Sequence, residues 1–182
     1  MKGKSGFASF AVMVTALVFG CGSEAAGDEI VQDENSPNSI AVSNYSLSWS
    51  FEDASIEIVV SAPTTGWVAI GFEPSSAMKD ANIIIGYVQD GEVFVRDDWG
   101  DGHISHSADT DLGGTSDVTG VSGSEADGIT EITFTIPLDS GDEYDRILVE
   151  GNTCKVILAY GPDDADNFQG YHAWVETIQL EL

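Results

Sequence analysis

Apolar and β-branched residues recur along most of the chain in short runs, with turn-forming residues between the runs. Such a pattern predicts strands, because the apolar residues of a half-buried strand alternate and those of a fully buried strand are continuous. We expect strands over residues 40–51, 55–62, 67–72, 81–88, 92–97, 116–123, 129–136, 153–160 and 171–182. No stretch shows a helical period over more than a turn or two.

Many short strands without intervening helices indicate an antiparallel β-sandwich or barrel. The sequence has no internal repeat that would suggest a propeller or a solenoid. We therefore predict an all-β domain built as a sandwich, and a barrel that binds an apolar ligand in its interior is the competing shape.

The first residues are typical of a targeting signal. Lys2 and Lys4 precede an apolar stretch, residues 7–19, that is too short to span a bilayer comfortably. Residues 17–21 (LVFGC) resemble the lipobox of bacterial lipoproteins, which implies that Cys21 becomes the lipidated first residue. The alternative is an ordinary secretory signal or a short anchor.

This interpretation divides the chain into a signal peptide at residues 1–20, a flexible acidic tether at 21–38 and a folded domain at 39–182. Gly22 follows the cysteine, so the resemblance implies retention at the outer membrane rather than the inner one. We expect a protein of the cell envelope whose membrane anchor is a lipid. Once Cys21 carries the lipid, Cys154 has no disulfide partner and is expected to be a small buried hydrophobe.

The net charge is −25 at pH 7. An acidic protein without a basic patch lacks the means to bind phosphate backbones, which excludes nucleic acid as a partner. The charge either serves solubility or steers a basic partner, such as a small positively charged electron carrier, and acidity alone does not choose between them.

Met78 lies in a polar connection between two expected strands, where methionine offers no turn chemistry. Its thioether is a good axial ligand for haem iron, and a histidine could bind the opposite side. His172 stands among aromatic residues before the last strand. His103 and His106 lie in an acidic loop and form a weaker alternative, a divalent metal site.

Several motifs, in this order along the chain, resemble the DOMON family. They are GWVAIGF at residues 66–72, MKDAN at 78–82, PLD at 137–139, ILAYG at 157–161 and a histidine shortly afterwards. The resemblance covers nearly everything from Ser39 to Leu182. It implies an immunoglobulin-like antiparallel β-sandwich of about nine to eleven strands that binds b-type haem or, in other branches, sugars.

The resemblance places the haem-ligating methionine and histidine of the family at Met78 and His172. Trp67, Phe72, Tyr171 and Trp174 are expected to line the pocket. With both axial positions filled, the implied function is one-electron transfer to a redox partner that is basic or membrane-bound, rather than catalysis. The alternative is a surface lipoprotein module that binds carbohydrate or another small ligand.

Overall fold

We describe the fold from a computed structural model, which describes residues 31–32 and 38–182. Within these residues ten strands have four or more residues, and two further strands, β1 and β8, have two each. The strands are β1 (Val31–Gln32), β2 (Ser39–Val42), β3 (Tyr45–Glu52), β4 (Ser55–Ala62), β5 (Val68–Phe72), β6 (Asn82–Gln89), β7 (Glu92–Trp99), β8 (Ser107–Ala108), β9 (Thr119–Ala126), β10 (Ile129–Pro137), β11 (Thr153–Tyr160) and β12 (Trp174–Glu181). The one helix among them, α1 (Asp109–Leu112), is a single turn.

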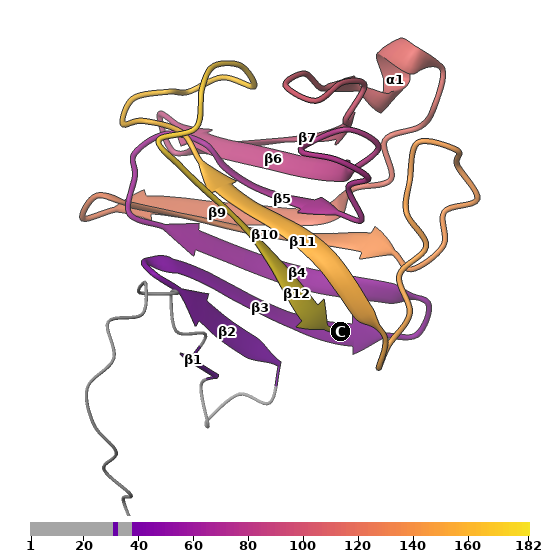
Figure 1. The fold of residues 1–182 in the computed structure, drawn as a ribbon. Coiled ribbons are helices and arrows are strands. Elements are labelled where there is room, and N and C mark those ends of the chain that lie inside the picture. Colours follow the sequence, from indigo (N-terminus) through magenta and orange to yellow (C-terminus); the bar gives the residue numbers. More distant parts are fainter. Residues whose placement is uncertain (1–30, 33–37) are drawn as a thin grey trace, which may run out of the picture.

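The strands form two antiparallel sheets packed face to face (Figure 1), so the predicted β-sandwich is confirmed. The first sheet has the order β1-β2-β3-β4-β10-β9, and the second has the order β12-β11-β5-β6-β7-β8. Alternate residues of each strand point into the space between the sheets. In the pairing of β4 with β10, for example, Ile58 lies opposite Phe134 and both are buried in the main core.

Two stretches differ from the strands predicted from sequence. Residues 40–51, expected as one strand, form the hairpin of β2 and β3, whose turn holds Ser43 at a φ of 53°. This turn lacks the Asn-Gly or Asp-Gly pair by which two-residue hairpins are recognised. The polar passage 100–114 contains β8 and α1, both too short to show a period.

The predicted signal peptide, the lipid attachment site at Cys21 and the first part of the tether lie outside the described residues. In the described part of the chain, no helix is long and apolar enough to cross a membrane. Cys154 is buried, as expected, and burial raises the pKa of its thiol to about 12.

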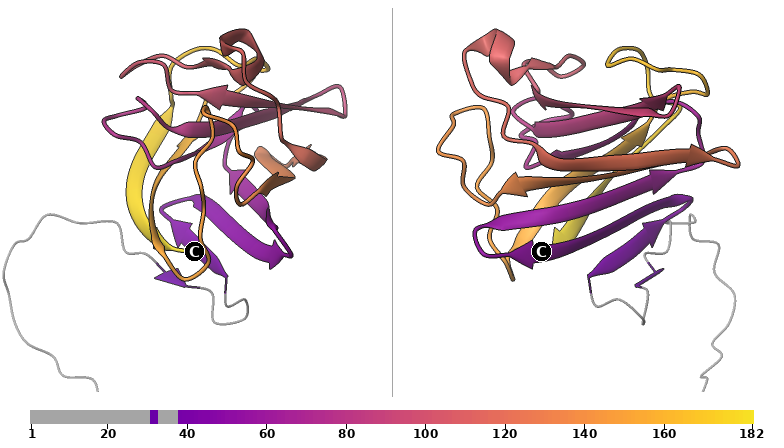
Figure 2. Two further views of the ribbon diagram at one scale, coloured as in Figure 1. Left: turned by 90° about the vertical axis from the view of Figure 1, so that its right-hand side faces the viewer. Right: turned by 180° about the vertical axis from the view of Figure 1, so that it is seen from behind.

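The second sheet has an outer face that is also covered. In Figures 1 and 2, the yellow segment after β11 and the segment that leads into α1 both rise on the side of this sheet that faces away from β3 and β4. These two segments, residues 161–173 and 100–107, carry all three histidines of the chain.

Candidate functional site

The outer face of the second sheet holds a small apolar cluster of its own, separate from the main core. One buried member, Trp67, immediately precedes β5, and the others lie in β5, β6 and β11. Phe94, Ala165 and Phe168 pack against them. The buried members are Trp67, Ala69, Ile85, Tyr87 and Ala159. They point outward because their neighbours in the strands, such as Val68 and Leu158, point into the main core.

Small residues let the segment that carries His172 pack closely against the start of β5. A side chain at Gly161 would place its Cβ 2.4 Å from Nε1 of Trp67, and one at Gly66 would place it 2.2 Å from the carbonyl oxygen of Pro162. The backbone N–H of Gly161 also donates to the carbonyl of Trp67 at 2.9 Å. Only glycine fits at these two positions without a backbone shift.

His172 lies at this end of the outer face. Its ring meets the ring of Trp67 edge to face, with 5.8 Å between the centroids. His172 is exposed to solvent on one side and covered by Trp67 on the other. This partial burial, and to a lesser extent the charge of His106, holds the pKa of His172 below its usual value. A lowered pKa favours the neutral imidazole, the form that can bind a metal ion.

Met78 lies at the other end of β5, in the connection to β6, and is partly buried. Its backbone is held by the segment after β7, because the N–H of Met78 donates to the carbonyl of His103 at 3.4 Å. A Cβ at Gly100 would lie 1.7 Å from the carbonyl oxygen of Met78, so this close approach requires glycine. Met78 and His172 thus lie beyond opposite ends of β5.

A charged network on the outer face joins the two segments. Asp98 of β7 has a fully buried side chain and accepts hydrogen bonds from Arg96, at 2.5 and 2.7 Å, and from Nδ1 of His106. Arg96 also stacks over the ring of Phe168, 4.6 Å from its centroid. His106, Asp98, Arg96 and Phe168 therefore connect the segment 100–107 with the segment 161–173.

The pKa of Asp98 reflects this network. Burial alone would raise it, but the hydrogen bonds and charges of His106 and Arg96 outweigh burial and hold the pKa below its usual value. Asp98 stays ionised, so it can fix the orientation of both partners. Sequence reasoning did not single out this residue, and its signal was the acidic pair Asp97-Asp98 inside a strand.

The structure places the four residues expected to line the pocket in different surroundings. Phe72 belongs to the main core between the sheets. Trp174 also packs against that core and stacks on Tyr45 at 5.8 Å, because strand residues alternate between the two faces. Tyr171 is almost fully exposed. Of the four residues, Trp67 is the one that lies in the outer cluster, beside His172.

The alternative metal pair is not brought together. His106 binds Asp98, whereas Nδ1 of His103 lies 3.2 Å from the carbonyl oxygen of Ser76 on the protein surface. Asp101, in the same loop, accepts hydrogen bonds from Ser105 and Ser107 instead of facing the histidines.

Comparison with solved structures shows the same fold in two fungal proteins. One is the cytochrome b domain of pyranose dehydrogenase from Coprinopsis cinerea, with a TM-score of 0.57 and 12% identity over 84% of this chain and 80% of that one. The other is the cytochrome domain of cellobiose dehydrogenase from Myriococcum thermophilum, with a TM-score of 0.58 and 12% identity over 83% of this chain and 80% of that one.

Among curated proteins, the chain is 28% identical to DBH-like monooxygenase protein 2 of Mus musculus, over 74% of this chain. It is 30% identical to DBH-like monooxygenase protein 1 of Homo sapiens, over 66% of this chain. The matched regions are 21% and 19% of those proteins, so the chain spans about a fifth of their length. The DOMON domain model matches residues 41–161. Because this match covers well over half of the sequence, the chain belongs to the DOMON domain family.

Proposed function

We propose that this protein is a b-type haem-binding module for one-electron transfer, with Met78 and His172 as the axial ligands. The observation that supports the proposal is the apolar cluster on the outer face of the second sheet, with His172 packed on Trp67 before β5 and Met78 in the connection after β5. The cytochrome domains that share the fold support the haem-binding part of the proposal.

The residues present fit this cofactor. Haem needs apolar walls and two ligands that approach from opposite sides. The outer cluster is apolar, with small side chains at Ala69 and Ala159, and Ala165 and Phe168 of the segment 161–173 pack against it where haem would have to lie. Met78 follows the end of β5 and His172 packs on Trp67 before its start, so the two side chains would reach a haem on the outer face from the two ends of this strand.

The chemistry of the two side chains determines the kind of function. When bound, haem supplies a one-electron couple, and a thioether ligand favours its reduced state. His172 offers a neutral imidazole because burial lowers its pKa. With Met78 and His172 both ligating, no coordination position stays open for oxygen, so the chain's role is electron transfer rather than oxygen chemistry.

Absorption spectra of the full-length protein with added haemin test this proposal. We expect a low-spin spectrum with sharp bands after reduction. Met78→Leu, which keeps the side-chain volume, and His172→Ala should each lose the low-spin signature. His103→Ala is the matched control and should leave the spectrum unchanged.

Two results would overturn parts of this proposal. Low-spin spectra that survive both ligand substitutions would overturn the ligand assignment. A protein that binds no haemin would overturn the cofactor, and would leave the alternative of a surface module that binds carbohydrate through aromatic side chains.

We also propose that the domain is held at the cell envelope by a lipid on Cys21 and exchanges electrons with a basic or membrane-bound protein. The lipobox-like residues 17–21 and the net charge of −25 support this. Full-length protein made in a bacterium should incorporate labelled palmitate and enter the detergent phase on Triton X-114 partitioning. Cys21→Ser should lose both properties, and equal partitioning of the two proteins would contradict the anchor.

A further inference from the structure

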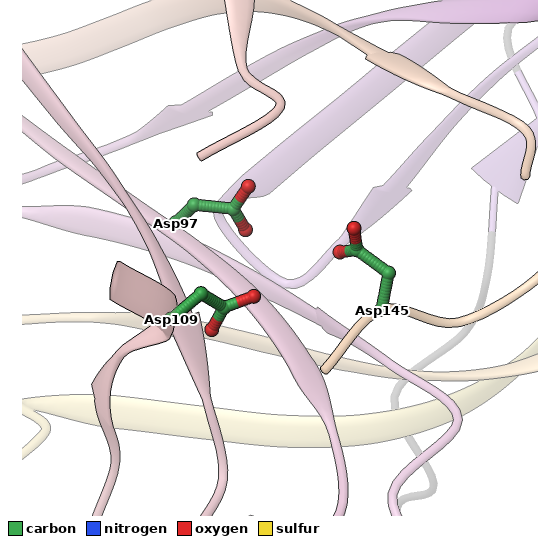
Figure 3. Close-up of side chains that lie close together, drawn as sticks. All are labelled: Asp97, Asp109 and Asp145. Carbon is green, nitrogen blue, oxygen red and sulfur yellow. The ribbon is translucent and has the colours of Figure 1, made fainter. Parts of the chain in front are cut away.

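Three aspartates from distant parts of the chain meet at one end of the sandwich (Figure 3). Asp97 comes from β7, Asp109 from the start of α1 and Asp145 from the connection between β10 and β11. One carboxylate oxygen of each lies within 4.8 Å of the others. This cluster is separate from the candidate haem site, because Asp97 and the neighbouring Asp98 point to opposite faces of the sheet.

The cluster is buried and lacks compensating partners. Asp109 is 0% and Asp97 is 2% exposed. Both oxygens of Asp109, Oδ1 of Asp97 and Oδ2 of Asp145 have no hydrogen-bond partner in the described part of the chain. Buried carboxylates without partners are costly, so they either take up protons or bind a cation.

No basic side chain in the described residues neutralises the cluster. The ion pairs found there both belong to Asp98. Arg146, the neighbour of Asp145, donates from Nε to the carbonyl of Asp80 at 2.8 Å and stacks on Trp99, 4.9 Å from the ring centroid. The positive charge that these carboxylates require must come from outside the chain.

A fourth, uncharged side chain faces the same cluster. Asn82 of β6 is 3% exposed, and its Nδ2 donates to Oδ1 of Asp145 at 2.6 Å. Its Oδ1 is buried without a partner. A half-turn of this amide exchanges the nitrogen for the oxygen and would direct a neutral oxygen ligand at the cluster, an observation independent of the three carboxylates.

We propose that Asp97, Asp109, Asp145 and Asn82 form a calcium-binding site. All four offer oxygen atoms, the ligands of hard cations, and none offers the nitrogen or sulfur that zinc and copper prefer. The ligands come from four separate segments, which suits the variable coordination of Ca²⁺ better than the strict octahedron of Mg²⁺. Water completes the coordination shell.

The electrostatics of the cluster agree with this geometry. Burial, followed by the charges of neighbouring acids, raises the pKa of Asp97 to about 7 and that of Asp109 to about 8. Burial likewise raises the pKa of Asp145 to about 6. A bound divalent cation would replace these protons and stabilise all three carboxylates in their ionised form.

The site would hold the passage between β7 and β9 in place. Through the bound ion, Asp109 would anchor this passage to β7 and to the connection after β10. The backbone N–H of Asp117 in the same passage donates to Oδ2 of Asp97 at 2.9 Å. The same passage carries His106, which contacts Asp98 on the other face of the sheet. Bound Ca²⁺ would therefore hold the passage that carries His106, and with it one edge of the outer face. The ion itself would lie on the opposite side of the sheet.

Terbium luminescence of the haem-free full-length protein tests the site. Tb³⁺ binds at calcium sites, and Trp99, two residues after Asp97 on the same face of β7, is placed to sensitise its emission. We expect a saturable Tb³⁺ signal that Ca²⁺ displaces. Asp109→Asn should weaken Tb³⁺ binding about tenfold or more, because affinity depends on the number of charged ligands. The matched control is Asp111→Asn on the exposed side of the same helix, which should bind as the parent does.

Thermal unfolding provides a second measurement that does not depend on Trp99. Ca²⁺ should raise the Tm of the parent and of Asp111→Asn but leave that of Asp109→Asn unchanged. In chelator, Asp109→Asn should melt no lower than the parent, because the amide removes the cost of protonating or burying this carboxylate on folding. A Tb³⁺ signal that persists in Asp109→Asn, or the absence of any Ca²⁺ effect on Tm, would overturn the site. Equal displacement of Tb³⁺ by Mg²⁺ would overturn the choice of calcium. Because both experiments use haem-free protein, their results do not bear on the proposed electron transfer.

Discussion

At the scale of single residues, Asp97 and Asp98 show how one step along a strand changes the chemistry of a carboxylate. Both are buried, yet the pKa of Asp97 is raised and that of Asp98 is lowered. Alternation turns Asp98 toward Arg96 and His106, and turns Asp97 toward two more aspartates. The surroundings of each side chain, not its depth, decide the sign of the shift.

The ionised state of Asp98 contributes to stability at neutral pH. A carboxyl whose pKa is lowered on folding stabilises the protein above its unfolded pKa, and this contribution disappears as pH falls through the folded pKa. Asp98→Asn should therefore lower the free energy of unfolding by about 2 kcal/mol at neutral pH. The difference should shrink as pH falls through the folded pKa, which lies below the ordinary carboxyl value. Urea denaturation at neutral pH and at about pH 3 measures this change. Glu57→Gln, on an exposed part of β4, should show little effect, and an equal loss at both pH values would contradict the role of the charge.

The aspartate cluster predicts the opposite pH dependence. Because the folded pKa values of Asp97 and Asp109, about 7 and 8, lie above the unfolded ones, the folded state holds more protons. In chelator, the free energy of unfolding should therefore fall as pH rises between about 4 and 8, by at most about 1.4 kcal/mol per pH unit for each proton.

Denaturation at a series of pH values, in chelator and with Ca²⁺, measures this slope. Ca²⁺ should restore stability most at the alkaline end, where the carboxylates are ionised. Asp109→Asn should reduce the slope in chelator. If the free energy of unfolding in chelator does not change with pH, the pKa values of Asp97 and Asp109 are not raised in the folded protein.

At the scale of elements, much of the fold could be predicted because strand periodicity is local. The strand expected at residues 55–62 is β4, and those at 129–136 and 153–160 are β10 and β11 within one residue. The hairpin at Ser43 was missed because its turn residues are not those that the commonest hairpins use.

The sites depend on contacts that local patterns do not contain. Met78 was singled out as a methionine in a polar connection and His172 as a histidine among aromatic residues, and the family motifs then pointed to the same two positions. The aspartate cluster could not be predicted, because Asp97, Asp109 and Asp145 meet only through the pairing of strands distant in sequence. Phe72 and Trp174 face the main core, a placement that sequence could not predict because an aromatic residue fits either side of a strand.

The docking of the Met78 loop on Gly100 gives a prediction at this scale. Gly100→Ala should force the loop away from β7, because the new Cβ would overlap the carbonyl oxygen of Met78. We expect a loss of about 2 kcal/mol in the free energy of unfolding and a weakened low-spin haem spectrum. Gly102→Ala is the control, because its Cβ would meet only the side-chain oxygen of Ser105, which can rotate away. Equal effects of the two substitutions would contradict the specific role of Gly100.

At the scale of the whole molecule, the strong negative charge acts on partners rather than on the fold. A net charge of −25 creates a long-range field that attracts basic proteins and repels anions, and salt screens both effects. This field acts at long range, so it does not depend on which surface of the protein exchanges the electron. From the net charge alone we can therefore predict how the rate of electron transfer changes with ionic strength.

Electron transfer from the reduced haem protein to a basic c-type cytochrome should slow at least about tenfold as ionic strength rises from about 20 to 200 mM. Transfer to ferricyanide, a small anion, should instead become faster over the same range, because salt removes repulsion. Stopped-flow absorbance with both oxidants measures the two trends in one preparation. The opposite signs separate electrostatic steering from a general effect of salt on the haem site. Rates that fall with salt for both oxidants would mean that the charge serves solubility and does not guide a partner.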